Sequence, residues 1–263
     1  MTCPSVLVEL GKRLPIATLM MALFAVAVAA VPGAGEWLQY DRAAIAGAEC
    51  WRLVTSHFVH WSGDHLFWDV LAFGVLGWLC ERSGRQSFLT CAGISAFLIP
   101  LTLWFALPQM ATYRGLSGLD SALFTLLATR VICQAACERD RSKLAVAVLV
   151  SCGFTAKIGF ELCTGTTLFV ESAAAGLIPI PLAHVVGGLV GIGCGLQESW
   201  RQIFIQPWMA HSFSRLEKGG AFREALVAPT MQAQPEAGTQ AVSIGSRARR
   251  SRSVCCETGF CDV

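Results

Sequence analysis

Residues 177–196 read LIPIPLAHVVGGLVGIGCGL, and this stretch decides the fold class. It contains no Asp, Glu, Lys or Arg, and His184 is its only histidine. A bilayer core about 30 Å thick is crossed by about 20 apolar helical residues. The stretch therefore predicts a membrane-spanning helix.

Five further apolar runs precede it, at residues 14–31, 65–80, 88–107, 116–136 and 144–160. Hydrophobic residues make up 54% of the chain and charged residues 14%, against roughly 45–50% and about 25% in soluble domains. We therefore expect an all-α membrane protein in which residues 14–197 form six transmembrane helices. Residues 1–13 would be a short N-terminal segment, and the long loop at 32–64 would lie partly in the membrane surface. Residues 198–263 would form a polar, disordered tail.

The distribution of Lys and Arg predicts the orientation, because cytoplasmic loops retain these residues. With the N-terminus inside the cell, sixteen of them fall on the cytoplasmic side. Only Arg42, Arg52 and Arg114 fall on the exterior side, and Lys157 lies within a span. Both termini are therefore expected in the cytoplasm.

Charge and cysteine content exclude several classes of partner. The 20 Lys and Arg against 18 Asp and Glu give a net charge of +2, which is too balanced for a protein that neutralises many nucleic-acid phosphates. Most of the 12 cysteines stand singly in apolar runs, where Cys behaves as a small hydrophobic residue. Cys255, Cys256 and Cys261 have no histidine beside them and are interpreted as ordinary thiols rather than metal ligands or acylation sites. We expect neither a metal nor a cofactor.

Polar side chains inside a bilayer are costly, so each is a functional candidate. Those in the predicted spans are His65, Asp69, Ser117, Asp120, Lys157 and His184. Ser117 opens the fourth span and His184 lies early in the sixth. Both spans begin at the exterior side, so the two residues should lie at similar depth.

Glycines would allow these spans to approach closely. Gly187, Gly191 and Gly195 follow His184 at +3, +7 and +11, a spacing that places small residues on one helical stripe. A neutral His184 could then accept the proton of Ser117 as a general base and return it to a leaving amine. No third member is required for this chemistry.

An acyl transfer also needs donors for the oxyanion. The backbone N–H of Ser117, near a helix N-terminus, is one candidate, and His65 is another. A soluble-hydrolase nucleophile elbow is not supported, because position 119 is leucine where that motif requires glycine.

Taken in order along the chain, these residues resemble the rhomboid intramembrane serine proteases. The resemblance rests on Trp51-Arg52, HFVHWSGDH at 57–65, Glu81, GLSG at 115–118, and Ala183-His184 with Gly187 and Gly191. It implies a six-helix bundle with a Ser117/His184 dyad in a water-filled cavity and an oxyanion hole formed by His65 and the Ser117 N–H. Substrates would be single-span membrane proteins cut near the exterior surface, and the location would be a bacterial cytoplasmic membrane.

Two positions depart from the family pattern. Rhomboids commonly have Asn four residues after the oxyanion-hole histidine, where this chain has Asp69. Burial favours the neutral form of a carboxyl group, and a protonated Asp69 could serve as a further oxyanion donor. Many rhomboids place an aromatic residue four positions after the serine, where this chain has Ser121. The short domain and these departures are similar to the rhombosortase branch, whose members process C-terminal sorting helices.

Several alternatives stay open. Asp120 and Lys157 could pair with each other or line the cavity. Trp51-Arg52 and Glu81 are interpreted as structural anchors, and His57 and His60 as loop-packing or interfacial residues. A rhomboid-like pseudoprotease that binds transmembrane helices without cutting them is the main rival function, against which the presence of both Ser117 and His184 argues. A small transporter would show paired broken helices in two related halves, a pattern this sequence lacks. The oligomeric state is left open.

Overall fold

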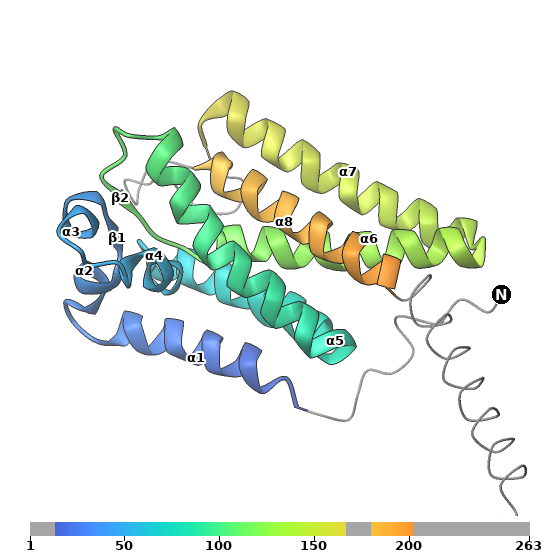
Figure 1. The fold of residues 1–263 in the computed structure, drawn as a ribbon, viewed down its shortest axis with the longest axis horizontal. Helices are drawn as coiled ribbons and strands as arrows, with labels where there is room; N and C mark the ends of the chain where they lie inside the picture. Colours follow the sequence, from blue (N-terminus) through green and yellow to red (C-terminus); the bar gives the residue numbers. More distant parts are fainter. Residues whose placement is uncertain (1–13, 167–179, 202–263) are drawn as a thin grey trace, which may run out of the picture. The chain divides into compact units, whose positions relative to one another are not determined.

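The computed structural model describes residues 14–166 and 180–201, and Figure 1 shows these as a bundle of helices. The elements in chain order are α1 (Ile16–Ala30), α2 (Ala34–Leu38), β1 (Tyr40–Asp41), α3 (Arg42–Ala46), α4 (Arg52–Thr55), the 3-10 helix η1 (Ser56–Phe58), α5 (Gly63–Ala106), β2 (Thr112–Tyr113), α6 (Ser117–Glu138), α7 (Arg141–Thr164) and α8 (Pro181–Trp200). The expectations for the N-terminal segment 1–13, and for all of the tail beyond residue 201, lie outside the described residues.

The expected all-α membrane architecture is confirmed. Each predicted apolar run is helical wherever the structure describes it, with ends that differ by a few residues. Within this part of the chain, α5, α6 and α7 are long and apolar enough to cross a membrane, and α1 is a shorter apolar helix. The number of spans stays a prediction.

α5 contains two of the predicted spans, and its backbone is non-helical at Gly84. The rings of Phe73 and Phe88, on either side of this break, lie 6.5 Å apart. In one straight helix the two residues would be about 22 Å apart, at about 1.5 Å per residue. The two halves of α5 therefore fold back on each other.

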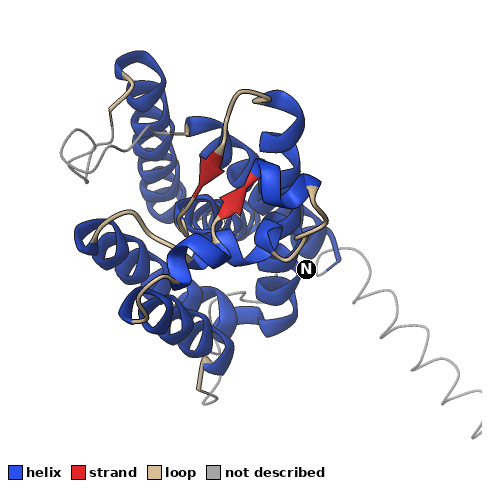
Figure 2. Ribbon diagram, turned by 90° about the vertical axis from the view of Figure 1, so that its left-hand side faces the viewer, coloured by secondary structure: helices blue, strands red, loops and turns tan. Residues whose placement is uncertain are grey.

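The long first loop is an ordered structure at one end of the bundle, here called the loop end, which comprises α2 to η1 and the β1–β2 pair (Figure 2). The strands are antiparallel, with Tyr40 opposite Tyr113. Arg42 donates to the carbonyl of Trp104 at 2.6 Å and lies over its ring. Arg52 donates to the carbonyls of Glu36 and Gln39 at 2.7 and 3.2 Å, so its interpretation as an anchor is confirmed.

Glu81 fastens α1 to α5. Its carboxylate accepts hydrogen bonds from the N–H groups of Ala17 and Thr18 at 3.1 and 2.8 Å, and from the Thr18 hydroxyl at 2.8 Å. The first N–H groups of a helix have no partner within that helix, so Glu81 caps α1 from a distant part of the chain. The interpretation of Glu81 as a structural anchor is confirmed.

α6 and α8 pack with their backbones in contact, and they run in parallel. A Cβ atom on Gly187 would collide with the carbonyl of Gly118, and one on Gly191 would collide with the carbonyl of Ala122. One turn further along, a Cβ on Gly195 would lie 2.8 Å from Cβ of Thr129. The predicted close approach along the glycine stripe is confirmed, and it brings the start of α6 to the start of α8.

Candidate active site

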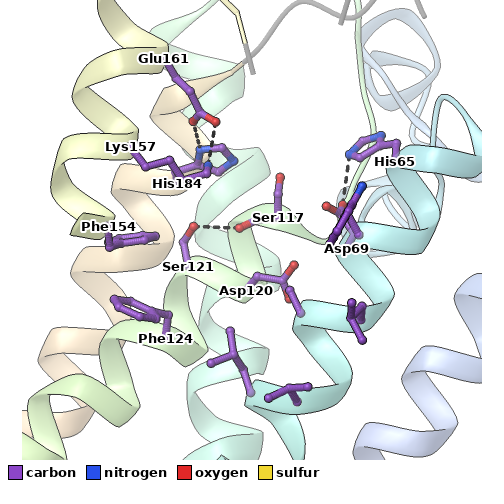
Figure 3. A pocket seen from close by; sticks show the side chains of 15 residues that line it. His65, Asp69, Ser117, Asp120, Ser121, Phe124, Phe154, Lys157, Glu161 and His184 are labelled. Atoms are coloured by element: carbon purple, nitrogen blue, oxygen red, sulfur yellow. Dashed lines mark hydrogen bonds and ion pairs between the residues drawn. The ribbon is translucent and has the colours of Figure 1, made fainter. Parts of the chain in front are cut away.

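A cavity of about 410 Å³ lies between the first half of α5, α6, α7 and the beginning of α8 (Figure 3). Its polar lining residues are His65, Asp69, Ser117, Asp120, Ser121, Lys157, Glu161 and His184. All six polar residues predicted from the spans therefore face one space. The other lining residues are apolar, as expected of a site within a membrane.

Ser117 is the first residue of α6, and the turn before it is built around Gly115. Gly115 has φ of +127°, a conformation that residues with a side chain rarely adopt. A Cβ there would also lie 3.0 Å from Nε2 of His65 and 3.2 Å from Oδ2 of Asp69. Glycine at this position therefore lets the chain enter α6 directly against His65 and Asp69.

The packing of α6 on α8 makes Ser117 and His184 neighbours across the two helices. A Cβ on Gly118 would lie 3.3 Å from the carbonyl oxygen of Ala183, so the residues that follow Ser117 and precede His184 touch. Both side chains line the cavity, and Figure 3 shows them at its polar upper part. Ser117 and His184 thus line one cavity, and a hydrogen bond between their side chains stays a prediction.

Glu161 is a site residue that the sequence reasoning missed. Its Oε2 lies 2.9 Å from Nδ1 of His184, and its Oε1 lies 2.7 Å from Nζ of Lys157. The predicted fifth span ended at residue 160, which left Glu161 outside the list of intramembrane polar groups. The signal available was its position four residues after Lys157, the spacing of an ion pair along one helix face.

Lys157 therefore pairs with Glu161, whereas the sequence had left open a pair with Asp120. Asp120 lines the cavity, and its Oδ1 is buried without a hydrogen-bond partner among the described residues. Asp120 and Lys157 were expected either to pair with each other or to line the cavity. The structure supports the second alternative, because both residues line the cavity.

Asp69 lies against the turn that precedes Ser117. Its Oδ2 accepts the N–H of Leu116 at 2.9 Å and lies 3.1 Å from Nε2 of His65 and 3.3 Å from Nε2 of His60. Oδ2 is therefore an acceptor in this structure, through the N–H of Leu116, a contact that the sequence could not place. The expected role of Asp69 as a neutral donor through its other oxygen stays a prediction.

The orientation of His65 bears on its expected oxyanion role. Its Nδ1 is positioned to accept the N–H of Trp61 at 3.5 Å, while Nε2 faces Asp69. The Nε2 donor is therefore shared with Asp69 in this arrangement. The N–H of Ser117, in the first turn of α6, has no acceptor within its own helix, and it makes no backbone hydrogen bond among the residues that the structure describes.

Position 121, where the family pattern has an aromatic residue, is a serine in this chain. Ser121 donates from its hydroxyl to the carbonyl of Ser117 at 2.8 Å. Aromatic rings reach the cavity from elsewhere, because Phe124 on α6 stacks on Phe154 of α7 with centroids 4.6 Å apart. These rings line the apolar part of the cavity.

His57 lies in η1, outside the predicted spans, and is fully buried. Its Nε2 is 3.2 Å from the carbonyl of Ala96, and its ring meets the ring of Tyr113 edge to face at 5.8 Å. Burial disfavours the charged imidazolium and lowers the pKa of His57 to about 4. His57 is thus a neutral packing residue, as predicted.

Within the described residues no cluster of three or more His, Cys, Asp or Glu side chains is arranged to hold a metal ion.

Comparison with known protein families gives one match. Residues 47–201, which make up more than half of the chain, match the family model of the Rhomboid domain. The matched range begins in the first loop and ends with α8, so it contains every residue of the cavity. No curated protein matches the sequence.

Proposed function

The chain belongs to the rhomboid family, and we propose that it is an intramembrane serine endopeptidase with Ser117 as nucleophile and His184 as general base. The observation that carries this proposal is the shared cavity: Ser117 and His184 line it together, from helices whose backbones touch beside both residues. A serine hydroxyl is a weak nucleophile until an adjacent base accepts its proton, and this packing supplies such a base inside an apolar bundle.

The reaction proceeds in two steps. Oγ of Ser117 attacks the scissile carbonyl carbon while His184 takes the hydroxyl proton and then delivers it to the leaving amine, which departs as the C–N bond breaks. Water next attacks the acyl-enzyme ester, gives its proton to His184, and Ser117 recovers that proton as the acid product leaves. In both steps the N–H of Ser117, at the positive end of α6, would stabilise the oxyanion.

The substrate would be a transmembrane helix that reaches the cavity from the lipid between α5 and α7. Trp68, Leu71 and Val75 of α5 face this space from one side, and Phe154 of α7 faces it from another. Of the described residues of α7, only Ala147 and Glu161 are buried, so this helix is loosely held in the bundle. We place the site toward the exterior face of a bacterial cytoplasmic membrane, with both termini inside.

The test is covalent labelling. A fluorophosphonate probe should modify the purified full-length chain at Ser117, as shown by peptide mass spectrometry, and Ser117→Ala should abolish the label. Ser121→Ala is the matched control, because Ser121 lines the same cavity one helical turn away, and this variant should still be labelled. A folded wild-type protein that takes no label and cuts no transmembrane reporter would refute the proposal and favour the rival function, a pseudoprotease.

A further inference from the structure

The contact between α7 and α8 places a carboxylate behind the proposed general base. Oε2 of Glu161 lies 2.9 Å from Nδ1 of His184, and both residues are buried. Ala147 and Glu161 are the only buried residues among those of α7, so a buried carboxylate on this helix is exceptional. An intramembrane carboxylate without a partner is costly, and here the partners are His184 and Lys157.

The contact fixes the tautomer of His184. An ionised carboxylate only accepts hydrogen bonds, so Nδ1 of His184 must carry a proton to bond with Oε2. In the neutral ring Nε2 is then unprotonated and has its lone pair available for the hydroxyl proton of Ser117. The opposite tautomer would present an N–H to the serine and could not accept its proton.

Lys157 secures the carboxylate from the other side. Its Nζ lies 2.7 Å from Oε1 of Glu161, one helical turn away on the same helix. The two carboxylate oxygens are thus divided between Lys157 and His184. This ion pair keeps Glu161 charged and limits its rotation, so that Oε2 stays directed at Nδ1.

We propose that Glu161 is a positioning residue that completes a Ser117–His184–Glu161 triad, with Lys157 holding Glu161 in place. The inference rests on the proposed protease function and extends it beyond the dyad that the family resemblance implies. Glu161 orients His184 and stabilises the imidazolium that forms when Ser117 loses its proton, and it does not itself take up the proton.

The pH dependence of the reaction gives a readout that a merely structural role would leave unchanged. The titratable groups that face His184 around the cavity are Glu161 and Lys157 from α7, Asp120 from α6, and His65 and Asp69 from α5. Of these, Glu161 is in direct contact with the imidazole. Loss of its charge should make His184 harder to protonate, so the acid limb of kcat/KM should move to lower pH.

The experiment compares wild type with Glu161→Gln in cleavage of a transmembrane reporter in detergent. We expect kcat to fall by about 10²- to 10⁴-fold, as for loss of the orienting carboxylate in serine proteases, with KM within about threefold and the acid limb displaced to lower pH. Lys157→Met should lower kcat by a smaller factor. Ser151→Ala is the control for disturbance of α7, since within the described part of the chain its hydroxyl bonds only the carbonyl of Ala147, and it should retain wild-type kinetics.

The outcomes separate the two proposals. If the wild type neither cleaves nor takes the serine probe, the proposed function fails. If the wild type is active and Glu161→Gln has its kcat and its acid limb unchanged, the triad is overturned. A loss of kcat that comes only with a lower melting temperature, and with no displaced acid limb, would also overturn it. Should Glu161→Gln not fold, Glu161→Asp carries the test, because it keeps the charge but withdraws it from Nδ1, and a wild-type kcat in this variant would refute the inference.

Discussion

Asp69 accepts the N–H of Leu116 in a hydrogen bond of 2.9 Å, although the two residues are far apart in the chain. Leu116 directly precedes Ser117, so the side chain of Asp69 fixes the turn from which the proposed nucleophile projects. The same oxygen faces Nε2 of His65 and of His60. One carboxylate therefore ties the first loop, α5 and the start of α6 together.

Substitution of Asp69 should test its role as the acceptor for the N–H of Leu116. Asp69→Asn keeps an oxygen for the N–H of Leu116 and should retain activity within about tenfold of wild type. Asp69→Leu leaves a buried N–H without a partner, at a cost of about 1–3 kcal/mol, and should lower both kcat/KM and the melting temperature. Reporter cleavage and thermal unfolding in detergent measure these effects. Wild-type activity in Asp69→Leu would show that the turn does not depend on this hydrogen bond.

Ser117 and His184 should act as one unit. Ser117→Ala and His184→Ala are each expected to reduce reporter cleavage by about 10³-fold or more, and the double variant should be no slower than either single variant, because removal of one member already disables the other. The rate constants of the three variants, measured with equal amounts of folded protein, test this. Additive losses would contradict a shared catalytic step, and substantial turnover by Ser117→Ala would exclude Ser117 as the nucleophile.

The glycine stripe of α8 offers a prediction about stability with an internal control. Gly187→Ala would place a Cβ against the carbonyl of Gly118 and separate α8 from α6, so it should destabilise the bundle by about 1–3 kcal/mol or more and reduce activity. Gly193 lies on the same helix, and a Cβ there would meet nothing within 4 Å. Gly193→Ala should therefore leave the melting temperature unchanged or slightly raised. Equal behaviour of the two variants would refute the packing argument.

Acid should weaken the fold through His57. Its pKa is lowered from an ordinary value of 6.5 to about 4 by burial, so between these pH values the unfolded chain binds a proton that the folded chain excludes. The free energy of unfolding should consequently fall as the pH falls through this window, by about 3 kcal/mol in total. His57→Gln cannot titrate and should show a shallower decline in denaturant unfolding measured from pH 7 to pH 4. An identical pH dependence in both proteins would exclude this contribution.

The sequence predicted the helices well because their signal is local. Apolar runs and glycine spacing depend only on nearby residues, so the six helical segments and the contact of α8 with α6 follow from them. The fold-back of α5 occurs at Gly84 without a long loop, so the two predicted spans follow each other with only a short break in the helical backbone. β1 and β2 are two residues each, too short for any alternating pattern.

The site was predicted less completely, because side-chain partners depend on contacts between distant residues. Ser117, His184 and His65 were found from their position in the spans. The donors around Asp69 come from Leu116, His60 and His65, and nothing in the local sequence indicates that they converge on one oxygen. Glu161 was not predicted as a site residue, because an ionisable residue near a span boundary is typical of the end of a helix. In the structure, α7 continues to Thr164.

Ser117 lies at the start of α6, next to the loop end, as the hydrogen bond from the N–H of Gly115 to the carbonyl of Ser56 in η1 shows. With the orientation predicted from Lys and Arg, this end faces the exterior. A helical substrate hides its carbonyls in i to i−4 hydrogen bonds, so it must unwind before Ser117 can reach one.

Substrates should therefore carry Gly, Ser, Ala or Pro near the exterior end of a single transmembrane helix, with a small residue at the cut. In a rhombosortase-like system that helix would lie at the C-terminus of the substrate behind a Gly-rich stretch, and cleavage would release the protein from the membrane. Comparison of membrane-bound and soluble secreted proteins in cells with wild type or Ser117→Ala, followed by sequencing of the new termini, provides the measurement. Cuts on the cytoplasmic side, or in soluble loops far from any membrane helix, would refute the mechanism and the orientation together, because neither position can reach a serine at the loop end.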